Sequence, residues 1–152
     1  MQEERIKEVF AESLREVMED EKLTVAAFAD SIACDVAAVR RWLYREHFAD
    51  ALVLVRIVRQ YRVSADYLFG LSDRREIAVS VRSDTFFARY CYLKKKNGMT
   101  DYAVGKFCNI KAGVISKWRK IRSYPKTAHL LRLAECLNCS LDYLFGLRAY
   151  AD

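Results

Sequence analysis

The sequence has few of the residues that interrupt helices, with one proline and five glycines among 152 residues. Turn-rich β folds depend on both residue types, so this scarcity disfavours such folds and is typical of helices joined by short loops. No apolar run approaches the ~20 residues needed to cross a bilayer. The N-terminal stretch MQEERIKEVF is acidic and lacks the basic and then apolar pattern of a signal peptide. We therefore expect a cytoplasmic protein that does not associate with membranes.

The sequence also lacks a recognisable catalytic or metal-binding pattern. Its five cysteines are an odd number without regular disulfide spacing, which indicates reduced thiols in a cytoplasmic protein. Cys136 and Cys139 have the spacing of a zinc or redox pair, but a second pair is missing and His47 and His129 do not complete a ligand set. We interpret these thiols as inert, with redox sensing as the alternative. Without a glycine-rich phosphate loop or a nucleophile motif, we expect neither an enzyme nor a cofactor or metal.

The charge of the chain is unevenly distributed along the sequence. The net charge is +6, and hydrophobic and charged residues make up 53% and 30% of the chain, a balance typical of globular proteins. Residues 1–76 carry 12 basic and 15 acidic side chains, whereas residues 77–152 carry 14 and 5. The net charges of the halves are thus −3 and +9. The second half is therefore a candidate for binding a polyanion, the alternative being a merely solvated basic surface.

The clearest pattern is an internal repeat. When the chain is shifted by 76 positions, its halves align without a gap, and Thr24 falls on Thr100 and Trp42 on Trp118. The run DYLFGL at residues 66–71 recurs unchanged at residues 142–147. The identical residues are mostly apolar or lie at expected helix boundaries. The repeat therefore predicts two copies of one fold more than two copies of one ligand site.

Each copy is predicted to contain five short helices. In the first copy, the apolar spacing and the capping residues predict helices over about 4–21, 24–32 and 35–45, followed by two that begin near residues 50 and 64. Gly70 and Gly146 are expected at helix ends, where a positive φ is needed. The expected N-caps are Thr24, Asp35, Asp50 and Ser64 in the first copy and Asp84, Thr100, Thr127 and Ser140 in the second. Lys111 replaces Asp35 in the repeat, so that helix is expected to begin less sharply.

These patterns predict a first domain over residues 1–71, a linker over 72–83 and a second domain over 84–152. Within the linker, Ile77, Val79 and Val81 alternate with polar or small residues, which indicates a short extended segment. Trp42 and Trp118 are expected in the cores rather than on a stacking surface. The aromatic residues of the repeated run are expected in the cores or at an interface, namely Tyr67, Phe69, Tyr143 and Phe145.

In each copy the second and third predicted helices are separated by a tight turn, the arrangement of a helix-turn-helix. The stretch from Met99 to Leu147 resembles the Xre/phage-repressor (lambda-repressor-like) helix-turn-helix family through MTDYAVGKF, VISKW, Pro125 and LLRLAECLNCSLDYLFGL. Residues 23–71 resemble a more diverged copy. The resemblance implies an all-α protein of two tandem five-helix helix-turn-helix domains. It also implies a transcriptional regulator, with repressor as the expected sign, that binds specific sequences of double-stranded DNA through the third helix in the major groove.

Helical spacing separates the two faces of the third helix. Ile115 and Trp118 lie inward in the second domain, and Val39 and Trp42 in the first. Basic residues on and just after this helix are candidate phosphate ligands, with a solvated basic face as the alternative. The candidate DNA-contacting residues of the basic domain are Thr100, Lys111, Ala112, Gly113, Ser116, Lys117, Arg119, Lys120, Arg122 and Lys126. Those of the acidic domain are Arg40, Arg41, Tyr44 and Arg45.

The sequence departs from the family pattern at positions that face DNA. Ala112 and Gly113, like Val36 and Ala37 in the first domain, cannot hydrogen-bond a base, although Ala or Val can contact a thymine methyl group. Asp101 and Val25 stand where the family often has a glutamine that contacts phosphate. We therefore expect backbone contacts to dominate.

The family also often has an ion pair between the first and third helices. Met18 and Leu43 occupy these positions in the first domain, where an apolar contact is the expected replacement. Lys94 and Arg119 occupy them in the second domain and carry like charges, which is consistent with phosphates nearby. Lys94, Lys95 and Lys96 end their helix, where basic residues complement the helix dipole without any ligand, and we favour this interpretation over contact with phosphate.

Two arrangements on DNA remain open. In one, both domains bind and the chain is a pseudo-dimer that reaches half-sites ~34 Å apart. In the other, which we favour, the basic domain binds DNA and the acidic domain forms a homodimer or binds a partner. The alternative function is a protein-interaction or dimerisation module that keeps the fold without binding DNA.

Overall fold

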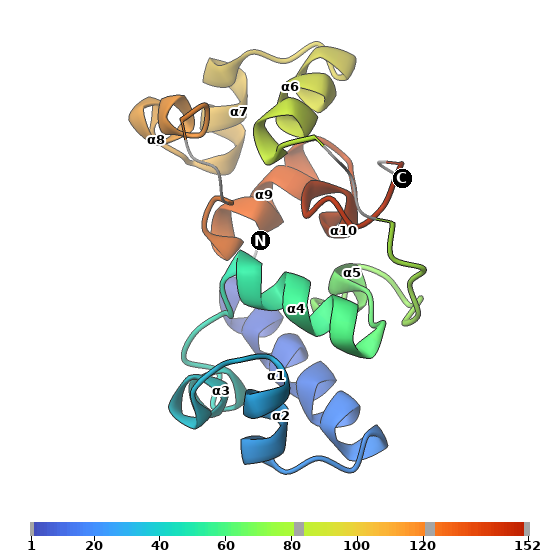
Figure 1. Ribbon diagram of the computed structural model, residues 1–152. Helices are drawn as coiled ribbons and strands as arrows, with labels where there is room; N and C mark the ends of the chain where they lie inside the picture. Colours follow the sequence, from blue (N-terminus) through green and yellow to red (C-terminus); the bar gives the residue numbers. More distant parts are fainter. Residues whose placement is uncertain (1, 81–83, 121–123, 151–152) are drawn as a thin grey trace. The chain divides into compact units, whose positions relative to one another are not determined.

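The computed structural model describes residues 2–80, 84–120 and 124–150 (Figure 1). These residues form ten α-helices and no extended strand, which confirms the predicted all-α class. The chain divides into two compact units, residues 1–79 and residues 80–152. None of the described helices combines the length and apolar character required to traverse a membrane.

The first unit contains five helices, of which the first is the longest (Figure 1). They are α1 (Glu3–Asp20), α2 (Val25–Ser31), α3 (Val36–Leu43), α4 (Ala51–Tyr61) and α5 (Ala65–Leu68). Helix α3 packs against α1 and α2, while α5 packs against α1 and α4. The ring of Phe10 on α1 stacks on that of Phe69 with 4.8 Å between centroids, so the middle of α1 is held against the end of α5.

The second unit repeats this order of helices. They are α6 (Phe86–Lys96), α7 (Asp101–Cys108), α8 (Ala112–Lys117), α9 (Thr127–Cys136) and α10 (Leu141–Leu144). Helix α7 packs against α8 and α9, and α10 packs against α6 and α9. Trp118 and Trp42 are buried, at 2% and 5% exposure, which confirms the predicted core positions. Trp118 meets the ring of Tyr90 edge-on at 5.3 Å between centroids.

The aromatic residues of the repeated run differ in their environments. Phe69, Tyr143 and Phe145 are buried, as expected. Tyr67 is only half-buried, and its hydroxyl donates to Glu16 Oε1 at 2.8 Å. This hydrogen bond is the main reason why the pKa of Tyr67 is raised. Tyr67 therefore links α5 to α1 by a polar contact.

Most of the predicted N-caps are confirmed. At these positions the side-chain oxygen accepts a hydrogen bond from the amide three residues later, which satisfies one of the free amides of the first turn. The residues are Thr24, Asp50, Ser64, Thr100 and Ser140. Asp35 and Lys111 also stand at N-cap positions, but neither side chain makes a capping bond.

Two of the predicted N-caps are wrong. Thr85 rather than Asp84 caps α6, because the Asp84 carboxylate instead accepts from Arg89 Nη1 at 3.0 Å. Lys126 rather than Thr127 is the N-cap residue of α9, and Thr127 is buried as the first residue of the helix. Helix α9 therefore begins one residue earlier than the capping preference of threonine predicts.

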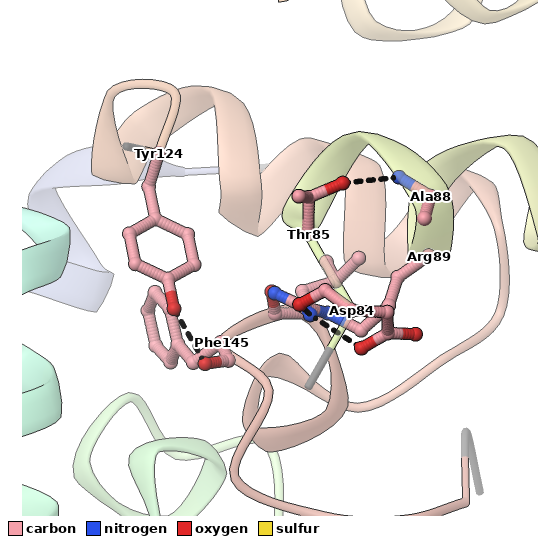
Figure 2. Close-up of polar contacts among 7 residues, drawn as sticks. Asp84, Thr85, Ala88, Arg89, Tyr124 and Phe145 are labelled. Atoms are coloured by element: carbon pink, nitrogen blue, oxygen red, sulfur yellow. Dashed lines mark hydrogen bonds and ion pairs between the residues drawn. The ribbon is translucent and has the colours of Figure 1, made fainter. Parts of the chain in front are cut away.

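Arg89 joins the start of α6 to the end of α10 in the second unit (Figure 2). Its side chain is 2% exposed, and its Nη2 donates to the Leu144 carbonyl at 2.9 Å. Its Nη1 donates to both the carbonyl and the carboxylate of Asp84. A Cβ on Gly146, which has a φ of +75°, would lie 3.2 Å from the guanidinium. Glycine at this position therefore provides both the backbone conformation and the space for the buried arginine.

Residues 72–79 of the predicted linker lie in the first unit. The Arg75 carbonyl accepts from the Ser64 amide at 2.7 Å, and the Ile77 amide donates to the Arg62 carbonyl at 3.2 Å. The Arg75 guanidinium pairs with Glu16 at 2.9 Å and also with Asp20. This stretch therefore pairs with the segment between α4 and α5, where Val63 and Glu76 form an isolated antiparallel β-bridge. Val81 of the predicted extended segment lies outside the described residues.

Candidate nucleic-acid interface

The candidate interface is built on α7, a short turn and α8. The turn begins at Asn109, which has a left-handed φ of +55°, and the equivalent Ala33 in the first unit has a φ of +54°. A Cβ on Gly105 would lie 2.8 Å from the Ile110 carbonyl oxygen. The absence of a side chain at Gly105 therefore allows the chain after the turn to approach α7 closely.

Helix α8 has one buried face and one exposed face. Ile115 and Trp118 are buried, as the spacing predicts. Helical geometry brings Ala112, Gly113, Ser116 and Lys117 together on the exposed side. The Ser116 hydroxyl donates to the Gly113 carbonyl at 3.0 Å, so its oxygen remains an available acceptor. The exposed face thus offers small side chains at its start and a positive charge at its end.

The basic residues on and after α8 are exposed. Among the described residues, none forms an ion pair with Lys111, Lys117, Lys120 or Lys126. The Arg119 guanidinium differs, because it lies 5.7 Å from the centroid of the Phe87 ring. Arg122 lies outside the described residues. The uncompensated lysines give this surface a positive potential that attracts anions.

The remaining two candidates of the second unit lie at the starts of other helices. Thr100 is exposed, and its hydroxyl oxygen accepts from the Ala103 amide as the cap of α7. Lys126 precedes α9. Just before it, the Tyr124 hydroxyl donates to the Phe145 carbonyl at 2.7 Å, with the two rings edge-on (Figure 2). Tyr124 therefore fastens the chain between α8 and α9 to the end of α10.

Lys94, which shares its charge sign with Arg119, has an acidic partner within the chain. Lys94 Nζ binds Asp101 Oδ1 at 2.7 Å, and the Tyr90 hydroxyl donates to the same oxygen at 2.6 Å. The Lys94 and Tyr90 hydrogen bonds hold the pKa of Asp101 below its usual range. Burial and this bond raise the pKa of Tyr90. Lys94 is thus neutralised within the chain, and Asp101 is a residue of this surface whose role the sequence did not reveal.

The equivalent surface of the first unit is less basic. Arg40 and Arg41 are exposed on α3, and Tyr44 is 68% exposed just after it. Arg45 has a φ of +65°, and its guanidinium lies 3.9 Å from a carboxylate oxygen of Glu8. One of the three arginine charges is therefore partly compensated by α1. Met18 and Leu43, for which an apolar contact is expected, are both buried.

The cysteines are free thiols. Burial raises the pKa of Cys108 to about 12 and also raises that of Cys136, whose Sγ lies 3.8 Å from Met99 Sδ. Because the thiolate is the reactive and metal-binding form, these shifts disfavour oxidation or metal binding at neutral pH. In the part of the chain that the structure describes, no group of three or more His, Cys, Asp or Glu side chains is arranged to hold a metal ion.

Comparison of the chain with family models, curated proteins and solved structures gave no match.

Proposed function

We propose that the second unit binds double-stranded DNA with α8 in the major groove, and that the chain is a sequence-specific transcriptional regulator, in the first place a repressor. The observation that carries this proposal is the exposed face of α8 with the segment after it. There Lys117 and Lys120 form no ion pair with a described residue, and Lys126 follows at the next helix. Such lysines suit phosphates, because each contact releases condensed counterions from the duplex.

The local geometry supports the same proposal. In both units two short helices meet across a turn with a left-handed residue, Ala33 or Asn109. The second helix of each pair buries its tryptophan and exposes its opposite face. This is the arrangement expected of a tandem helix-turn-helix protein resembling the Xre/phage-repressor family, in which the second helix of the motif enters the major groove.

Binding is proposed to depend more on phosphates than on bases. Ala112 and Gly113 expose no polar side-chain atoms, so they contribute at most apolar contacts to thymine methyl groups. Among the described residues of this face, Ser116 and Lys117 have side chains that can hydrogen-bond a base edge. We therefore expect strong salt dependence and modest discrimination between sequences.

The test is a fluorescence-anisotropy titration of a labelled mixed-sequence duplex at several salt concentrations. We expect the logarithm of the binding constant to fall linearly with the logarithm of salt concentration. The double variant Lys117→Ala/Lys120→Ala removes two exposed charges and should reduce the magnitude of that slope by about two. Helical circular dichroism of the variant serves as the control for folding.

The absence of binding at low salt would refute the DNA proposal and favour the protein-interaction alternative. The small and apolar residues at the start of both motif helices motivate that alternative. Ala37, Ala112 and Gly113 are exposed there, and Val36 is half-buried. For the first unit we propose a role in homodimerisation or partner binding, because its net charge opposes contact with phosphates.

A further inference from the structure

A groove of about 570 Å³ lies beside the proposed DNA-contacting face, between α7 and the start of α8. The residues that matter here are Tyr102, Gly105 and Lys106 from α7 with Asn109, Lys111 and Ala112 from the turn and α8. Gly105 and Ala112 contribute little side-chain volume. Since Lys111 and Ala112 also belong to the proposed interface, the groove is continuous with it.

Tyr102 and Lys106, which both line this groove, contact each other. Lys106 Nζ lies 5.4 Å from the centroid of the Tyr102 ring. A cation–π contact of this kind orients the ammonium without using its hydrogen-bond donors. The Tyr102 side chain is 71% exposed, so its ring adds little to the core. Both side chains are therefore free to serve a ligand.

The internal repeat shows that the basic character of this groove is not a consequence of the fold. A shift of 76 positions places Tyr102 on Ala26, Lys106 on Asp30 and Lys111 on Asp35. Asp30 and Asp35 are both exposed in the first unit. The same backbone arrangement thus carries two positive charges in one unit and two negative charges in the other. The charges at these positions therefore suit an anion in the second unit and oppose one in the first.

The acidic residue on the rim of the groove does not oppose this assignment. The Asp101 carboxylate also lines the groove, but it is bound by Lys94 at 2.7 Å. Its negative charge is therefore offset by a lysine outside the groove. Lys106 forms no ion pair with a described residue, so its positive charge remains available.

We propose that this groove binds a backbone phosphate of the duplex contacted by α8, with Lys106 as the positive charge and the Tyr102 hydroxyl as a hydrogen-bond donor. This inference rests on the proposed function, since the phosphate belongs to the same DNA. A lysine ammonium serves as a point charge for phosphate, and contacts of this type fix the register of a protein on DNA without reading its sequence. The groove therefore adds a second anchoring point beside α8.

The test compares two substitutions that change the net charge equally. Lys106→Gln removes the proposed phosphate ligand, whereas Lys96→Gln removes an exposed lysine from the last turn of α6. In the full chain, we expect Lys106→Gln to reduce the salt slope of duplex binding by about one and Lys96→Gln to leave it unchanged. Lys106→Arg should restore the slope. Tyr102→Phe should weaken binding without changing the slope.

The outcomes separate this inference from the proposed function. Suppose that the wild type binds DNA and that Lys117→Ala/Lys120→Ala reduces the salt slope of duplex binding, while Lys106→Gln leaves it unchanged. The groove assignment is then overturned and the proposal of DNA binding stands. If the wild type fails to bind at low salt, both are overturned. If Tyr102→Phe and Lys106→Gln weaken binding to a single-stranded oligonucleotide but not to a duplex, the groove instead serves unpaired nucleic acid, and the assignment to duplex phosphate is again wrong.

Discussion

At the scale of single residues, Arg89 carries a large desolvation cost that its hydrogen bonds must offset. Its guanidinium is almost fully buried and is bound by the carbonyls of Leu144 and Asp84 and by the Asp84 carboxylate. A buried charge that keeps all its partners is tolerated, whereas removal of one side leaves the other unsatisfied. The first unit has the small, uncharged Ser13 buried at the equivalent position.

We predict that Arg89→Met lowers the free energy of unfolding of the second unit by about 1–3 kcal/mol, because the Leu144 carbonyl and the Asp84 carboxylate lose the hydrogen bonds that Arg89 donates. The measurement is urea unfolding followed by Trp118 fluorescence in a Trp42→Phe background. The chain has two tryptophans, so this background reports on the second unit alone. Lys95→Met, an exposed change on the same helix, is the matched control. Equal midpoints for the two variants would show that Arg89 adds nothing to stability.

One polar contact of the second unit, the ion pair of Lys94 with Asp101, could not be predicted from the sequence. The ion pair of Lys94 with Asp101 joins positions seven residues apart, across the turn between α6 and α7. Helical spacing relates residues three or four apart on one helix and says nothing about such a contact. The role of Asp101 therefore depends on the angle between two helices, which the sequence alone does not provide.

At the scale of elements, the approach of α8 to α7 depends on one glycine and not on another. A Cβ on Gly105 would lie 2.8 Å from a backbone oxygen, whereas a Cβ on Gly113 would meet nothing within 4 Å. A backbone oxygen cannot move aside as the end of a flexible side chain can. The two glycines of this motif therefore have opposite consequences for stability.

We predict that Gly105→Ala destabilises the second unit by about 1–3 kcal/mol through overpacking. Gly113→Ala should stabilise it by about 0.5–1 kcal/mol, because alanine loses less conformational freedom than glycine within a helix. Urea unfolding with the Trp118 probe measures both changes against the same parent. An unchanged Gly105→Ala would mean that α8 does not approach α7 as described, and a destabilised Gly113→Ala would mean that the surface of α8 at Gly113 is not open.

The helix boundaries could be predicted largely from capping chemistry, and the two errors have local causes. Asp84 and Thr85 are both good capping residues, and Arg89 decides between them by binding the aspartate. For α9, the repeat places Lys126 on Asp50, the N-cap of α4, and so indicates the correct boundary. The capping preference of threonine predicts Thr127 instead, but Thr127 is the first residue of the helix and is buried.

At the scale of the whole molecule, one fold carries opposite charges in its two copies. The apolar and boundary residues that recur along the chain specify the helices, and they were sufficient to predict an all-α protein with buried tryptophans at equivalent positions. The exposed residues have diverged, with Asp30 and Asp35 where the second unit has Lys106 and Lys111. The repeat therefore predicts the fold of both units but not a shared ligand, which must be argued from each surface separately.

This divergence leads to a prediction about which unit contacts DNA. Arg40→Ala/Arg41→Ala removes two exposed charges from α3, the same number that Lys117→Ala/Lys120→Ala removes from the second unit. We expect the arginine variant to keep the salt slope of the wild type, because the net negative charge of the first unit, much of it on α1, repels phosphates. The comparison uses the same labelled duplex and salt series for both variants. An equal loss of about two from the slope in each variant would instead mean that both units contact DNA, as a pseudo-dimer requires.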